Sequence, residues 1–206
     1  MIKVFHIPQF RSLRVVWLLE EMGEGYTLEI VPFPTDDAFK ARSLIGSIPT
    51  IIDGDVVMGE SIAILQYLTG RRIRDPAVAR LTVGPSDPIA YAEHLQFLHL
   101  GEASLMTPLS LLARTRLGAP EDEKHNFTAQ IVEDLVSRRL QAVDKRLADG
   151  RTHLTGERFT IADISVGYAL AYATFRGLDD LLTPNAAAYL ARLKARPSYQ
   201  RAIART

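Results

Sequence analysis

The stretch that decides the fold covers residues 46–68, GSIPTIIDGDVVMGESIAILQYL. Two short runs of β-branched and apolar residues, 50–52 and 56–58, flank an Asp-Gly pair, which is a strong hairpin signal. After Ser61 the apolar residues recur at helical rather than alternating spacing. The stretch therefore predicts a strand, a tight turn, a second strand and a helix.

Two positions in this stretch predict local chemistry. Ser61 is expected to be the N-cap of the helix, and the free N–H groups at a helix start form a site for a carboxylate or a phosphate. Ile48-Pro49 opens the first strand of the hairpin, where proline removes a hydrogen-bond donor from the ladder. We predict a cis peptide bond at this proline.

The chain upstream of the hairpin completes a small α/β domain. With the hairpin and its helix, the elements run β-α-β-α-β-β-α, which is the order that a thioredoxin-like domain needs. The first helix begins at Ser12, and Gly23 stops it. Upstream strands are expected over residues 2–7 and 26–31, and upstream helices over residues 12–22 and 36–44.

The rest of the chain is predicted to be helical. Proline and glycine breakers without a periodic apolar face make residues 76–87 a linker between a domain of residues 1–75 and an all-helical, bundle-like domain of residues 88–206. Thr160 and Asp163 form a capping box, so both are interpreted as structural residues. Helices are expected over residues 88–117 with a bend at Pro108, 127–147, 160–175 and 185–195.

The composition excludes several classes of protein. A chain of 206 residues with 47% hydrophobic residues can bury one or two cores, which excludes a disordered or fibrous protein. The formal net charge of zero gives no general attraction for nucleic acid or acidic membranes. The absence of cysteine excludes disulfides, zinc-thiolate sites and a cysteine nucleophile. Without a signal peptide or a membrane-spanning run, the expected location is the cytoplasm.

Three motifs in the right order resemble one family. They are residues 12–21, SLRVVWLLEE; the hairpin stretch; and residues 156–164, GERFTIADI. Together they resemble the cytosolic glutathione S-transferase family, of a bacterial type, over essentially the whole chain. The resemblance implies a thioredoxin-like N-terminal domain that binds glutathione, an all-helical C-terminal domain, and a homodimer.

The resemblance also implies roles for residues around the hairpin. The hydroxyl and backbone N–H of Ser61 would hold the γ-glutamyl carboxylate of glutathione, and Glu60 would hold its α-amino group. The backbone of Ile48, beside Pro49, would pair with the cysteinyl part. No cofactor is expected, because glutathione is a co-substrate.

Other interpretations of the polar residues fit less well. Residues 59–63, GESIA, nearly match the nucleophile elbow of hydrolases, but the chain that follows is helical and no histidine follows His153. His94 and His99 lie on one predicted helix and point about 140° apart, so they cannot share a metal ion. His6 could contact a ligand, although a histidine at such a position is more often packed. No metal site is predicted.

Arg11 and Arg14 crowd the start of the first helix. Positive charge at this end conflicts with the helix dipole. The pattern therefore favours either a bound anion or a pair of solvated arginines.

The residue that activates the glutathione thiol is not given by the resemblance. The positions that hold serine, cysteine or tyrosine in better-known classes of the family fall on Gln9, on Arg11 and near Phe5. Ser12 is the only hydroxyl in the loop, and its O–H group could face a sulfur anion at the helix start. We predict Ser12 as the catalytic donor, Arg11 as a source of positive potential, and Gln9 or His6 as the reserve donor. Gln9 is also predicted to contact glutathione. The alternative is that Ser12 is an ordinary N-cap pointing away.

The predicted function is that of a glutathione transferase in detoxification. It would add the glutathione thiolate to a small hydrophobic electrophile seated between the domains. Phe10, Leu105, Met106 and Pro108 would line the electrophile pocket. The alternatives are a glutathione-binding or protein-interaction module of the same fold without transferase turnover, and a glutathione-dependent peroxidase. Neither nucleic acid nor a membrane is an expected partner.

Overall fold

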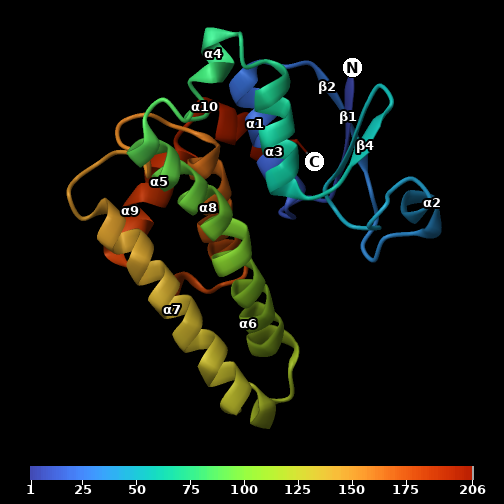
Figure 1. Cartoon of the computed structure of the whole chain (residues 1–206). Helices are drawn as coiled ribbons and strands as arrows, with labels where there is room; N and C mark the ends of the chain where they lie inside the picture. The colour runs from blue at the N-terminus through green and yellow to red at the C-terminus, as the bar shows by residue number, and fades with distance from the viewer. Residues whose placement is uncertain (206) are drawn as a thin grey trace. The chain divides into compact units, whose positions relative to one another are not determined.

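The chain forms two compact units in a computed structural model that describes residues 1–205. The first unit consists of Met1–Thr82 together with the chain from Lys194 onward. The second unit is Val83–Leu193. Figure 1 traces both units along the chain.

The first unit holds a four-stranded sheet made of β1 (Ile2–His6), β2 (Tyr26–Ile30), β3 (Thr50–Asp53) and β4 (Val56–Met58). The strand order is β2-β1-β3-β4, with β1 parallel to β2 and antiparallel to β3. The predicted hairpin is confirmed, because β3 pairs antiparallel with β4 and Ile51 lies opposite Met58. Gly54 supplies the positive φ of 61° that the tight turn requires.

The helices of the first unit are α1 (Ser12–Met22), α2 (Asp37–Lys40), α3 (Ser61–Arg71), α4 (Pro76–Ala79) and α10 (Pro197–Ile203). The order β1-α1-β2-α2-β3-β4-α3 confirms the thioredoxin-like α/β domain. Helix α1 packs against both α3 and β1, and its apolar residues are fully buried. Gly23 ends α1 in the left-handed conformation, as the sequence predicts.

Several local predictions differ from the structure. Helix α3 begins at Ser61 itself, so Glu60 and not Ser61 is its N-cap residue. Ser61 lies inside the first turn, and its hydroxyl oxygen accepts a hydrogen bond from Arg14. Helix α2 is shorter than predicted and ends at Lys40; beyond it, the Ser43 hydroxyl accepts a hydrogen bond from Gly46 N–H. The cis bond predicted at Ile48-Pro49 is confirmed.

The end of the chain packs on the first unit and not with the helical unit. Helix α10 lies along α1 (Figure 1). Arg196 binds both carboxylate oxygens of Glu21, at 2.7 and 3.1 Å, and Trp17 meets Tyr199 edge to face at 4.9 Å. Burial raises the pKa of Glu21, but the hydrogen bonds from Arg196 and Ser198 outweigh it, so the pKa lies below its ordinary value. The chain from Lys194 onward, which the prediction assigned to the all-helical domain, thus packs within the first compact unit.

The predicted linker has structure of its own. Residues 76–79 form α4, with Asp75 as its side-chain cap. Val78, Leu81 and Val83 are buried. The boundary between the two units falls after Thr82, inside the predicted linker.

The second unit is helical, with α5 (Pro88–His99), a π-helix η1 (Leu100–Met106), α6 (Thr107–Gly118), a 3₁₀ turn η2 (Glu121–Glu123), α7 (Phe127–Leu147), α8 (Ile161–Phe175), a 3₁₀ turn η3 (Asp179–Leu181) and α9 (Pro184–Lys194). This confirms the helical C-terminal part of the predicted fold. Helix α8 is the centre of the unit, because nearly all of its residues are buried.

The long helix predicted over residues 88–117 is interrupted before Pro108. The π-helix η1 lies ahead of this proline, and Pro108 falls in the first turn of α6, where its missing N–H is tolerated. At Gly101, η1 approaches α8 so closely that a Cβ atom would lie 2.6 Å from the Ser165 backbone carbon. The Ser165 hydroxyl donates to the Leu98 carbonyl at 2.7 Å. The close approach therefore leaves no room for a side chain at position 101.

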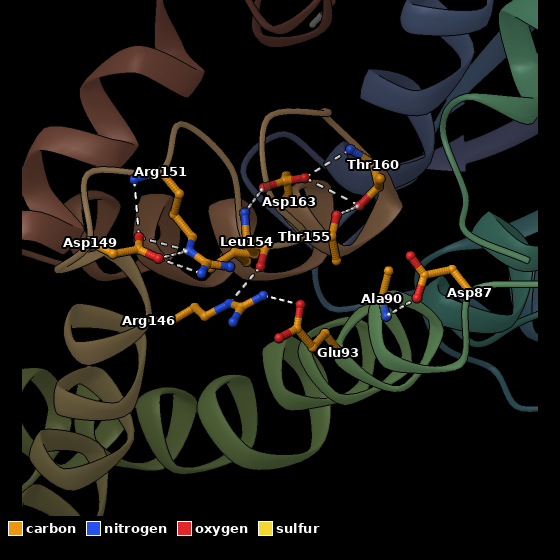
Figure 2. Close-up of polar contacts among 10 residues, drawn as sticks. All are labelled: Asp87, Ala90, Glu93, Arg146, Asp149, Arg151, Leu154, Thr155, Thr160 and Asp163. Atoms are coloured by element: carbon orange, nitrogen blue, oxygen red, sulfur yellow. Dashed lines mark hydrogen bonds and ion pairs between the residues drawn. The ribbon is translucent and has the colours of Figure 1, made fainter.

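The capping box predicted at the start of α8 is confirmed. The Thr160 hydroxyl accepts from the first turn of α8, and Asp163 accepts from the Thr160 N–H at 2.8 Å. Asp163 also accepts from Leu154 N–H at 2.9 Å and from the Tyr189 hydroxyl at 2.7 Å. Figure 2 shows Asp163 between Leu154 and Thr160. The carboxylate thus ties three segments of the second unit together.

Over residues 1–205, no helix is both long enough and apolar enough to span a membrane. Nor does this part of the chain bring three or more His, Cys, Asp or Glu side chains together as metal ligands.

Candidate functional site

The start of helix α3 is the first part of the candidate site. Ser61 is the first helical residue and only 3% exposed, whereas the preceding Glu60 is exposed. Glu60 holds a positive φ of 65°, which is uncommon for a residue with a side chain. No side chain caps this helix, so the first N–H groups of α3 have no intrahelical or side-chain acceptor. An exposed acid, a buried hydroxyl and uncapped N–H groups therefore meet at one helix start.

The uncapped start of α3 contrasts with other helices of the chain. Five helices begin with a side-chain oxygen that accepts from a backbone N–H of the first turn. The capping residues are Asp36 for α2, Asp75 for α4, Asp87 for α5, Asn126 for α7 and Thr160 for α8. Helices α1, α6 and α10, like α3, begin without such a cap. Of these, α1 and α3 begin at or next to the residues predicted to bind and activate glutathione.

The hairpin places the cis proline beside the start of α3. A Cβ atom on Gly59 would lie 3.6 Å from the Pro49 carbonyl oxygen and 3.2 Å from a methyl group of Ile45. Ile48 is partly buried and packs against the core cluster at one end of the sheet. One corner of the first unit thus holds four residues that were predicted to form one site: Ile48, Pro49, Glu60 and Ser61.

A buried arginine connects this corner to helix α1. The Arg14 side chain is fully buried, and its Nη1 donates to the Ser61 hydroxyl oxygen at 3.0 Å. Arg14 lies in the first turn of α1, so its charge adds to the positive end of that helix. The sequence pattern showed a basic cluster at this place but gave no reason to separate Arg14 from Arg11.

Ser12 does not have the geometry predicted for a thiol donor. Its side chain is fully buried, and its hydroxyl lies 3.3 Å from both the N–H and the carbonyl oxygen of Ile7. The hydroxyl proton is therefore used within the loop, where it fixes the end of β1 against the start of α1. Ser12 is also the first residue of α1, and its N-cap is Arg11.

The exposed part of the loop lies just before Ser12. Gln9 is exposed and has a φ of 64°, the second positive φ among the non-glycine residues described. Phe10 is partly buried and packs against Phe33, with ring centroids 5.1 Å apart. Arg11 is partly buried at the helix start. Of the candidate donors, Gln9 is the one that solvent reaches.

His6 is a packed histidine. Its side chain is 1% exposed, and burial lowers its pKa to about 4, although a hydrogen bond with the backbone of Arg205 acts in the opposite direction. His6 is therefore neutral near pH 7. This environment favours the structural interpretation of His6 over a role as reserve donor.

The residues predicted to line an electrophile pocket lie in both units. Phe10 belongs to the first unit. Leu105, Met106 and Pro108 belong to the second unit, at the end of η1 and the start of α6, and all three are buried. The predicted pocket stays a prediction.

Two family models match the chain. "Glutathione S-transferase, N-terminal domain" matches residues 11–71, and "Glutathione S-transferase, C-terminal domain" matches residues 122–192. The two matches together span well over half of the chain. This protein belongs to the glutathione S-transferase family. The resemblance of its three sequence motifs is thereby confirmed.

Similar proteins match nearly the whole length of this chain. The glutathione S-transferase GstA of Escherichia coli O157:H7 is 29% identical over 98% of this chain and 96% of its own. Crystal structures of glutathione transferases from Actinobacillus pleuropneumoniae and Methylococcus capsulatus are each 28% identical, with TM-scores of 0.81. Both cover 98% of this chain, and the chain covers 91% and 97% of theirs, respectively.

Proposed function

We propose that this transferase binds glutathione with its γ-glutamyl end at the start of α3. The observation that carries the proposal is the uncapped helix start, where the buried Ser61 hydroxyl adjoins the exposed Glu60 carboxylate. The γ-glutamyl end carries one carboxylate and one ammonium group. A helix start suits the carboxylate, and a neighbouring acid suits the ammonium group. Relatives named as glutathione transferases support the same ligand.

The backbone of Ile48 is proposed to hold the cysteinyl part of glutathione. An extended peptide can add a strand through main-chain hydrogen bonds. The contact of Gly59 with the Pro49 carbonyl brings this segment next to the start of α3. A tripeptide held by its γ-glutamyl end at Ser61 can therefore reach Ile48.

Replacing Ser61 by alanine is expected to weaken glutathione binding about ten- to a hundredfold, because a hydrogen bond to a charged group is lost. Glu60→Gln is expected to weaken binding about tenfold through the ammonium group. Isothermal titration calorimetry with glutathione measures both changes.

Thr69→Val is the matched control for these variants. Thr69 lies on the same helix and is buried, but its hydroxyl donates to the Leu65 carbonyl at 2.9 Å. Its replacement removes a buried hydroxyl without touching the proposed site. Unchanged affinity in both Ser61→Ala and Glu60→Gln would overturn the binding assignment.

We propose that the bound thiol loses its proton to solvent and that the thiolate forms a carbon–sulfur bond with a small hydrophobic electrophile. A leaving group, where the electrophile carries one, departs with the electron pair of its bond. The Phe10–Phe33 pair offers aromatic surface beside the loop in the first unit. Contributions from Leu105, Met106 and Pro108 are part of the same proposal.

The donor to the thiolate is proposed to be Gln9, with Arg11 adding positive potential. The Ser12 hydroxyl is engaged by Ile7, whereas the Gln9 amide is exposed on a residue of unusual backbone conformation. A residue with a side chain at positive φ costs about 1–3 kcal/mol, so such residues often mark functional sites. The start of α1 adds its partial positive charge.

Gln9→Ala is expected to raise the pKa of the bound thiol by about half a unit or more, which corresponds to about 0.7 kcal/mol of lost thiolate stabilisation. Gln9→Asn keeps an amide and tolerates positive φ, so the pKa of the bound thiol is expected to stay closer to that in the unsubstituted protein. The thiolate absorbance of bound glutathione, titrated against pH, measures the change. A shift in Ser12→Ala but not in Gln9→Ala would return the role to Ser12.

One observation favours the alternative of a glutathione-binding module without transferase turnover. No hydroxyl in the loop before α1 is left to donate to a sulfur anion, because Ser12 bonds Ile7 in both directions. Activity against a panel of electrophiles and peroxides, with and without glutathione, distinguishes the transferase, the peroxidase and the non-catalytic module. Turnover that depends on glutathione and an electrophile supports the transferase.

A homodimer in the cytoplasm, acting in detoxification without a further cofactor, is also proposed. Family membership supports this context. Helix α7 carries two exposed apolar side chains one turn apart, Phe127 and Ile131, which a second copy could cover.

A further inference from the structure

A side-chain hydrogen bond between Arg14 and Ser61 joins the first turn of α1 to the first residue of α3. The two residues are 47 positions apart in sequence, and Nη1 of Arg14 lies 3.0 Å from the Ser61 hydroxyl oxygen. Arg14 is fully buried and Ser61 nearly so. Solvent therefore screens this contact little.

The direction of this hydrogen bond decides what Ser61 can do. A guanidinium group has only donors, so the Ser61 oxygen must be the acceptor. A serine hydroxyl has one proton, and that proton then points away from Arg14 and can be donated to a ligand. Ser12 and Thr69 differ, because their hydroxyls donate to the carbonyl groups of Ile7 and Leu65.

Three sources of positive charge at this place favour the binding of an anion. Arg14 brings a buried positive charge to the first turn of α1 and against the start of α3. The N-terminal end of each helix adds partial positive charge, and neither helix has an acid in its first turn. Glu60, the acid that precedes α3, is exposed.

We propose that Arg14 is a positioning residue that fixes Ser61 as a donor and makes the site select a free carboxylate at the γ-glutamyl end of the ligand. The inference rests on the proposed binding of glutathione at Ser61. According to this inference, Arg14 causes the preference of the site for a carboxylate and does more than pack α1 against α3.

Two ligands test the selection directly. One is glutathione, and the other is its analogue with 4-aminobutyrate in place of the γ-glutamyl residue, which keeps the amine but lacks the carboxylate. Calorimetry on the full chain is expected to show a preference for glutathione of about tenfold or more, as for a hydrogen bond to a charged group. Arg14→Met and Arg14→Gln are each expected to reduce this preference at least about fivefold, with Arg14→Lys closer to the unsubstituted protein.

The analogue separates positioning from folding. A purely structural Arg14 would lower the affinity for both ligands alike and leave their ratio unchanged, and that result would overturn the proposal. Of the two neutral variants, either one that stays folded by circular dichroism decides the question. Arg71→Met is the matched control, because Arg71 belongs to the same unit and pairs with Glu24 and Asp53.

A double variant tests whether Arg14 acts through Ser61. In a Ser61→Ala background, a neutral Arg14 substitution is expected to reduce glutathione affinity further by less than about twofold, because residues that act together are not additive. Losses that multiply in full would overturn the proposed route. Absence of glutathione binding in the unsubstituted protein would instead refute the proposed function itself. Binding with an unchanged ligand preference in the Arg14 variants would refute only this inference.

Discussion

Lowering the pH from 7.5 to 5.0 is expected to reduce the free energy of unfolding by about 2 kcal/mol for each of two buried histidines. His6 lies in the first unit and His94 in the second, and each is 1% exposed. Burial lowers the pKa of both from 6.5 to about 4, and the charge of Arg158 adds to the effect at His94.

The direction of this effect follows from where the proton binds. Below pH 6.5 the unfolded chain takes up a proton on each histidine, while the folded chain resists protonation until about pH 4. The stability that neutral histidine contributes is therefore complete above pH 6.5 and is lost as the pH falls toward 4. At pH 5 the acids with lowered pKa values, such as Glu21, remain charged.

Two spectroscopic signals separate the histidines. Trp17 is the single tryptophan of the chain and lies in α1, so its fluorescence follows the first unit. Far-UV circular dichroism follows mainly the helices of the second unit. Urea unfolding at pH 7.5 and 5.0 is expected to show a smaller pH dependence by fluorescence in His6→Asn, and by dichroism in His94→Asn.

His99→Asn is the control, because His99 lies on the same helix as His94 but is exposed. The comparison uses the difference between the two pH values, so a general loss of stability in a variant cancels. If neither buried variant changes that difference, both histidines are already charged in the folded protein.

The fold of the first unit was readable from sequence because its signals are local. The Asp-Gly turn, the β-branched runs and the helical spacing after Ser61 each lie within a few residues, and the structure places the hairpin and α3 there. Helix α10 was missed, although Pro197 is its first residue and proline is common at that position. It has only seven residues, and its packing depends on Glu21, 175 positions before Arg196.

The interruption of the helix predicted over residues 88–117 could not be predicted from local signals in the same way. Proline at position 108 is a visible local signal, so the prediction placed the bend there. The π-helix before it is accompanied by a close approach between Gly101 and Ser165, which lie far apart in sequence. A contact of this kind leaves no periodic pattern in either segment.

In the candidate site, too, some features could be predicted from the sequence and others could not. Glu60 and Ser61 follow from a strand-to-helix junction and are adjacent in sequence. The donor assignment to Ser12 depended on which way one hydroxyl points, and the structure points it at Ile7. The role proposed for Arg14 rests on a hydrogen bond to a partner 47 residues away. Sequence reasoning therefore predicted the residues of this corner but could not assign their hydrogen bonds.

Asp163→Ala is expected to destabilise the second unit by about 3 kcal/mol or more, because each buried donor left without an acceptor costs about 1–3 kcal/mol. The substitution removes the acceptor of the Leu154 and Thr160 N–H groups, which lie 2.9 and 2.8 Å from the carboxylate (Figure 2). It also leaves the Tyr189 hydroxyl, 2.7 Å from the carboxylate, without this acceptor. Burial raises the pKa of Asp163, and the hydrogen bonds from Leu154, Tyr189 and Thr160 oppose that change.

A graded series separates the lost bonds from the lost charge. Tyr189→Phe removes one donor together with its demand for an acceptor, so it is expected to cost only about 1 kcal/mol. Asp163→Asn keeps one acceptor oxygen and should fall between Tyr189→Phe and Asp163→Ala. Asp149→Asn is the control at an exposed carboxylate, which pairs with Arg151 at the edge of the same region (Figure 2). Urea unfolding followed by circular dichroism measures the order.

We expect this order of stability losses because Asp163, at the start of α8, accepts hydrogen bonds from three segments of the chain. A capping box alone needs only the bonds with Thr160, and its loss would cost about 1 kcal/mol. Leu154 and Tyr189 add partners from the preceding loop and from α9. A loss in Asp163→Ala no larger than that in Tyr189→Phe would show that the carboxylate acts as a simple cap. Glutathione affinity per folded molecule is expected to stay unchanged throughout, because the proposed glutathione contacts lie in the first unit.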